Sequence, residues 1–158
     1  MVESATRPGV ALGVDLGSRR IGISVSDSGR VLARPHSVIT RSGDDAKDRD
    51  EIAALVESSG ATVVVVGVPF SLSGREGPAA RAARTEIEAL EARLQVPVVT
   101  IDERLSTVEA TRRLAEARPA GSSRRTVPRR GGATRRRPVD DAAAAIILQS
   151  WLDSGATR

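Results

Sequence analysis

Three short stretches of the sequence each place acidic residues beside glycine, alanine or serine. Asp15 lies in GVDLGSRRIG, Asp102 and Glu103 lie in IDERLST, and Asp140 and Asp141 open VDDAAAA. A buried carboxylate is costly unless a metal ion, a cation or hydrogen-bond donors compensate its charge. Carboxylate oxygens from separate segments are ligands that Mg²⁺ and Mn²⁺ prefer. Together, the three stretches favour a metal site built from oxygen ligands.

Each acid also has an ordinary structural explanation. Asp15 could pair with one of the two arginines that follow it, and Glu103 could pair with Arg104 or Arg113. Acids in the first turn of a helix are stabilised by the helix dipole without having any function. Only the combination of three such stretches indicates a site.

The apolar pattern predicts the elements that position these acids. It predicts strands at 10–17, 21–27, 30–40, 61–69 and 96–102. Helical spacing predicts helices over 45–60, 75–95 and 139–153, and a capping box formed by Ser106 and Glu109 predicts another that runs through Leu114. This order predicts an α/β fold with a mixed five-stranded sheet, three antiparallel strands followed by two parallel ones, and helices on both faces.

Alternation along the first strand predicts the surroundings of Asp15. The even-numbered residues from Val10 to Leu16 share one face, which leaves Ala11, Gly13 and Asp15 on the other. The next strand likewise collects its glycine and serines on one face. We therefore expect Asp15 to look onto a surface of small residues. A loop shaped by a glycine and a proline in VGVP is expected near the strand ends.

Positive charge is concentrated in one segment. Residues 118–137 hold eight arginines and no acid, so the rest of the chain has a net charge of −4 although the whole chain has +4. Such a segment suggests a polyanionic partner whose phosphates are contacted locally, and the alternative is a solvated loop that binds nothing. Its proline and glycine content predicts a flexible loop at about 118–138 within a single domain spanning residues 1–158.

Composition argues against several function classes. The chain has no cysteine, which excludes disulfides, zinc–thiolate sites and cysteine nucleophiles. Its one histidine, His36, fits the pattern of the third strand and is interpreted as structural rather than as a general base. With Trp151 and Phe70 as the only aromatic residues, base stacking cannot be a main mode of binding. No signal peptide or membrane span is recognisable, so we expect a cytoplasmic protein without a membrane partner.

Four motifs in this order resemble the YqgF/RuvX family over nearly the whole chain. They are the Asp-x-Gly-x-x-Arg-Ile-Gly pattern at 15–22, VGVP at 66–69 followed by LSGREGPAA, DERLST at 102–107, and VDDAAAAIILQSWL at 139–152. The resemblance implies an RNase H-like fold and a metal-dependent endonuclease acting on structured nucleic acid. Its implied substrates are the 5′ end of pre-16S rRNA and Holliday junctions.

The family's acidic triad, carried over by motif, falls on three residues of this chain. It implies that Asp15, Glu103 and Asp140 are catalytic and hold Mg²⁺ or Mn²⁺, with Asp102 and Asp141 as neighbours that could share in metal binding. The residues expected to contact phosphates are Arg19, Arg20, Arg129, Arg130, Arg135, Arg136 and Arg137.

Two other function classes stay open at this stage. A non-catalytic nucleic-acid-binding module would keep the arginines and treat the acids as structural. A nucleotide-binding protein of the actin and sugar-kinase type would use Asp15 and its loop on phosphate, but such sites lie between two domains and this chain is expected to have one. The sequence does not distinguish a precursor RNA from branched DNA as partner, nor a monomer from a homodimer.

Overall fold

A computed structural model describes residues 8–69, 75–105 and 138–155. The elements are β1 (Val10–Leu16), β2 (Arg20–Ser26), β3 (Ala33–Thr40), α1 (Asp45–Ser59), β4 (Ala61–Val68), α2 (Pro78–Arg93), β5 (Val98–Asp102), the short 3₁₀ helix η1 (Glu103–Leu105) and α4 (Pro138–Asp153). The expected helix through Leu114 and the arginine segment lie outside the described residues. None of the helices in the described part combines the length and apolar character that a membrane span needs.

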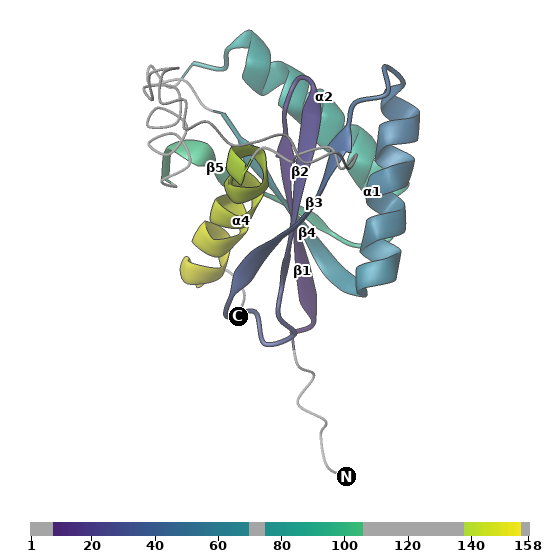
Figure 1. Cartoon of the computed structure of the whole chain (residues 1–158). Coiled ribbons are helices and arrows are strands. Elements are labelled where there is room, and N and C mark those ends of the chain that lie inside the picture. The colour runs from purple at the N-terminus through teal and green to yellow at the C-terminus, as the bar shows by residue number, and fades with distance from the viewer. Residues whose placement is uncertain (1–7, 70–74, 106–137, 156–158) are drawn as a thin grey trace, which may run out of the picture.

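The five strands form one sheet in the order β3-β2-β1-β4-β5 (Figure 1). β1, β2 and β3 pair antiparallel as consecutive strands, and β4 and β5 continue the sheet in parallel with β1. The parallel pairings need crossovers, which the helical segments between those strands supply. The predicted mixed sheet, with three antiparallel strands followed by two parallel ones, is confirmed.

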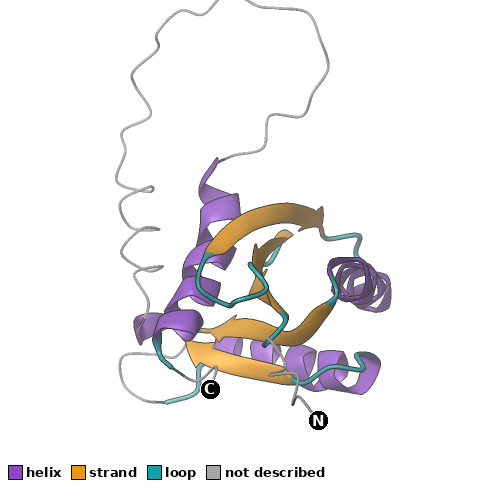
Figure 2. Ribbon diagram, turned by 90° about the horizontal axis from the view of Figure 1, so that it is seen from below, coloured by secondary structure: helices purple, strands orange, loops and turns teal. Residues whose placement is uncertain are grey.

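Helices cover both faces of this sheet (Figure 2). On one face, α1 and α2 enclose a core that includes Leu12, Val14, Ile21 and Val64. On the other face, α4 packs through Ile147 and its neighbours on a smaller cluster. The alternation predicted for β1 is confirmed, because Ala11 belongs to the α4 cluster whereas Leu12 and Val14 belong to the other.

Among the boundaries that differ from the sequence prediction, two are explained by local structure. β3 begins at Ala33 rather than at residue 30, since the Asp27 carboxylate accepts the backbone N–H groups of Val31 and Leu32 at 2.8 Å and closes a turn there. α2 begins at Pro78 rather than at residue 75, because proline suits the first helical turn, where its missing N–H costs no intrahelical bond.

Candidate active site

Asp15 lies near the end of β1, on the face that α4 covers. Asp15 is only 9% exposed, and it is paired with Gly22 of the neighbouring strand β2. The following turn is fixed by the residue after β3, because the Arg41 backbone N–H donates to Arg19 O at 2.9 Å and its Nε donates to Gly17 O at 3.0 Å. Strand pairing with β2 therefore holds Asp15 itself, and Arg41 holds the turn that follows it.

Glu103 is brought to the same region by the end of β5. It is 8% exposed and begins η1. A Cβ added to Gly67 would lie 3.0 Å from Glu103 Oε1 and 2.6 Å from Ile147 Cδ1, so the Glu103 side chain and α4 both rest against this glycine. Gly67 is therefore a residue of β4 beneath the acid and not part of a loop, which corrects the expectation from VGVP.

The sheet register makes Asp15 and Glu103 neighbours. β1 and β4 are paired through Val14 and Val66, and the next residue on each strand is Asp15 and Gly67 respectively. Because Glu103 packs over Gly67, two buried carboxylates lie on one sheet face, on a floor of small residues. Their oxygens are donors of the kind that Mg²⁺ takes. The described residues include no group of three or more histidine or acidic side chains able to hold a metal ion.

Asp102, adjacent in sequence, has a different environment. It pairs with Val68, a residue of the α1 and α2 core, and its carboxylate is bound by Arg104, with Nη2 to Oδ2 at 2.6 Å and the backbone N–H to Oδ1 at 2.9 Å. Hydrogen bonds from the Arg104 side chain hold the pKa of Asp102 below its ordinary value. Asp102 is thus a charged carboxylate engaged by a local cation.

Asp140 and Asp141 lie in the first turn of α4, and their side chains lie outside the described part of the structure. One turn further on, Ala144 is fully buried against the sheet. The structure thus brings together Asp15 and Glu103, and it places the start of the helix that carries Asp140.

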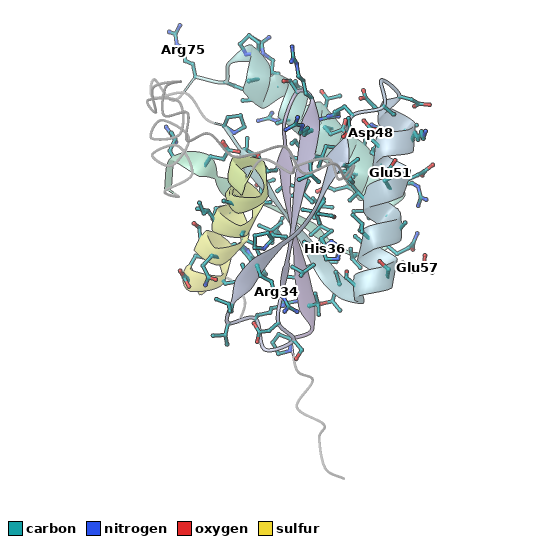
Figure 3. The ribbon with its side chains drawn as sticks, viewed as in Figure 1. Arg34, His36, Asp48, Glu51, Glu57 and Arg75 are labelled. Atoms are coloured by element: carbon teal, nitrogen blue, oxygen red, sulfur yellow. The ribbon has the colours of Figure 1, made fainter. Side chains whose placement is uncertain are left out.

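The arginines predicted to contact phosphates fall into two groups, those within the described residues and those outside them. Arg19 is exposed in the turn that follows Asp15, and Arg20 is exposed at the start of β2. Arg129, Arg130, Arg135, Arg136 and Arg137 lie outside the described residues. Arg75, just before α2, points away from the fold (Figure 3). His36 is exposed on β3, and its Nδ1 lies 2.9 Å from Ser37 Oγ, away from both acids in the strand register.

Sequence reasoning missed the structural parts played by Arg41 and Ser24. Arg41 holds the turn after Asp15, and the Ser24 hydroxyl donates to the Ala144 carbonyl oxygen at 2.7 Å. The alternation along β2 did place Ser24 on the correct face. No sequence signal identified the backbone atoms that these two side chains bind.

Comparison with known proteins identifies the family. The family model described as "RuvX: Holliday junction resolvase" matches residues 9–154. A protein of Thermobifida fusca named "Putative pre-16S rRNA nuclease" is 48% identical over 149 residues, covering 94% of this chain and 89% of that protein. A relative of the same name from Frankia casuarinae is 43% identical over 75% of this chain, which spans only 59% of that protein's length.

A solved structure supports the fold independently. Thermus thermophilus RuvC in complex with a Holliday junction substrate aligns with a TM-score of 0.55 at 16% identity, covering 93% of this chain and 96% of that one. RuvC has an RNase H-like fold, so the predicted fold class is confirmed. Since the family model spans nearly all of the described sheet and helices, the chain belongs to the RuvX family.

Proposed function

We propose that this chain is a nuclease that hydrolyses phosphodiester bonds in structured nucleic acid with the help of Mg²⁺ or Mn²⁺. The observation that carries the proposal is the pair of buried carboxylates, Asp15 and Glu103, on one face of the sheet beside the start of α4. Such a pair suits metal-dependent hydrolysis, because carboxylates can hold ions that would stabilise the attacking and leaving oxygens of an in-line displacement.

Different residues would hold the metal ions and contact the phosphate backbone. Asp15, Glu103 and Asp140 would hold the ions, which activate a water molecule and stabilise the leaving oxygen when bound. Arg19 and Arg20, exposed beside Asp15, would fix the phosphate backbone. The Asp102 carboxylate is bound by Arg104, so it would stabilise the junction of β5 and η1 instead of binding metal.

The names of the relatives point to two substrates. We infer a precursor of 16S rRNA as the first candidate, because relatives of 43–48% identity carry that name. A four-way DNA junction is the second, because the family description and the RuvC complex both name it.

The test is cleavage of both substrates by the purified full chain, with Mg²⁺ and with a chelator. We expect Mg²⁺-dependent cleavage of at least one substrate, and its loss in Asp15→Asn, which keeps the side-chain shape but removes the charge. Asp153→Asn is the matched control, because Asp153 is exposed at the far end of α4. Binding without cleavage by the wild type would contradict the proposal and favour a non-catalytic binding module.

A further inference from the structure

One polar contact fixes α4 to the sheet close to the candidate site. Gly13 and Ser24 are paired across β1 and β2, and the Ser24 hydroxyl donates to Ala144 O at 2.7 Å. A Cβ added to Gly13 would overlap the Ser24 hydroxyl and would lie 2.8 Å from Leu148 Cβ and 3.0 Å from Ala144 O. The helix backbone therefore rests directly on the sheet at this docking point, formed by Gly13, Ser24 and Ala144.

The direction of α4 relates this docking point to the acids. Gln149, further along α4, accepts a hydrogen bond from the Ala33 backbone N–H at 2.8 Å. Ala33 pairs with Ser26, at the end of β2 that is remote from the Asp15 turn. The helix therefore runs away from Asp15, and its first turn lies toward the end of the sheet that carries Asp15 (Figure 1).

Steps of similar length lead from the docking point to two of the acids. Asp15 lies two residues beyond Gly13 on the same face of β1, a step of about 6.6 Å along the strand. Position 140 precedes Ala144 by four residues, a step of about 6 Å along the helix axis. Both steps lead toward the same end of the sheet. Any sliding of α4 at the docking point would shift position 140 relative to position 15 by the same distance.

We propose that Ser24 is a positioning residue of the metal site. Its hydrogen bond fixes α4 along the helix axis and so sets where Asp140 stands relative to Asp15 and Glu103. This inference rests on the proposed function, because it assigns Asp140 to the metal site.

The chemistry of the contact favours positioning over simple stabilisation. Inside an α-helix, a carbonyl such as that of Ala144 already accepts an intrahelical N–H, so it does not need the hydroxyl to be satisfied. The apolar contacts around Ile147 and Leu148 are non-directional and would tolerate a small slide. An O–H···O bond of 2.7 Å does not tolerate it, because its strength falls steeply with distance and angle.

The test is Mg²⁺ binding to the full chain by titration calorimetry without substrate, together with the Mg²⁺ concentration that gives half-maximal cleavage. Ser24→Ala should weaken Mg²⁺ binding about tenfold, the lower end of what outer partners of metal ligands cost. Ser24→Cys keeps a donor that is weaker and larger, and its Mg²⁺ affinity should fall between those of the wild type and Ser24→Ala. If Ser24→Ala does not fold, Ser24→Cys alone decides.

Ser150→Ala is the matched control, because the Ser150 hydroxyl donates to Ile146 O at 2.8 Å, a hydrogen bond that lies within α4. It should leave Mg²⁺ binding unchanged. Ser24 variants that bind Mg²⁺ as tightly as the wild type, or a Ser150→Ala variant that binds it as weakly as Ser24→Ala, would overturn the proposal. If the wild type cleaves and either of these variant results is found, only the role of Ser24 is overturned. If the wild type neither binds Mg²⁺ nor cleaves, the proposed function is overturned as well.

Discussion

The two faces of the sheet differ in how closely their helices approach it. Beneath α1 and α2, large side chains such as Leu12, Ile21 and Ile23 fill the space between sheet and helix. Beneath α4, Gly13 and Gly67 leave so little space that added Cβ atoms would meet helix atoms within 3 Å. The first face, here called the thick face, is an apolar core, and the second, the thin face, brings polar backbone and side chains of the helix down to the strands.

A buried acid has a different setting on each side. On the α1 side, Asp48 lies in the first turn of the helix, while Glu51 and Glu57 of the same helix point to solvent (Figure 3). Its Oδ1 accepts the Ser42 hydroxyl at 2.7 Å and the Ser42 N–H at 3.0 Å, which explains its burial by local capping. On the thin face, Asp15 and Glu103 come from separate strands and share one floor. Convergence of distant acids, and not burial alone, marks the candidate site.

The largest expected effect separates two adjacent acids. Glu103→Gln should reduce cleavage by more than the roughly 10–100-fold that outer partners of a metal cost, because a ligand itself is lost. Asp102→Asn should reduce it far less, since Asp102 is engaged by Arg104. Initial cleavage rates at fixed Mg²⁺ measure both. Equal losses in the two variants would place Asp102 in the metal site and remove the distinction between them.

The second effect concerns the thick face. Leu12→Ala removes a fully buried side chain and should lower the free energy of unfolding by about 3 kcal/mol. Mg²⁺ affinity of the folded variant should stay unchanged, because Leu12 lies on the face away from the acids. Urea unfolding and calorimetry provide the two readings. Val31→Ala is the matched control, since this side chain is 72% exposed and its loss should cost almost nothing.

Gly67→Ala, on the thin face, should change stability less than Leu12→Ala and should change metal binding more. In Gly67→Ala the new methyl group meets Ile147 Cδ1 and Glu103, which should cost about 2 kcal/mol of unfolding free energy. Mg²⁺ affinity should also fall, because Glu103 must move. Gly77→Ala is the control, as no atom lies within 4 Å of a Cβ there. Unchanged Mg²⁺ affinity in Gly67→Ala would argue against Glu103 as a ligand.

Much of this architecture could be predicted from the sequence. Alternation in β1 and β2 correctly assigned Asp15, Gly13 and Ser24 to one face, because strand periodicity leaves no other choice. The position of Glu103 could not be derived in this way. It depends on where β5 ends and on the single turn of η1, and boundaries of that kind are set by tertiary contacts such as Glu103 resting on Gly67.

The smallest expected effect is a pH dependence on the α1 side. Hydrogen bonds from Ser42 hold the pKa of Asp48 below its ordinary value of 3.8. A lowered folded-state pKa contributes stability above the unfolded value, and this stability is lost as pH falls through the folded pKa. The melting temperature of the wild type should therefore fall as the pH drops below about 4, and that of Asp48→Asn should fall less. Parallel curves for the two proteins would show that Asp48 does not contribute.

The most direct test of the account is to locate the metal. Crystals of the full chain grown with Mn²⁺ should show anomalous density between the carboxylates of Asp15 and Glu103, beside the first turn of α4. The same density should disappear in Asp15→Asn and persist in Asp153→Asn. Density at Asp102 and Arg104, or density that persists in Asp15→Asn, would contradict the claim that the thin face of the sheet holds the metal site.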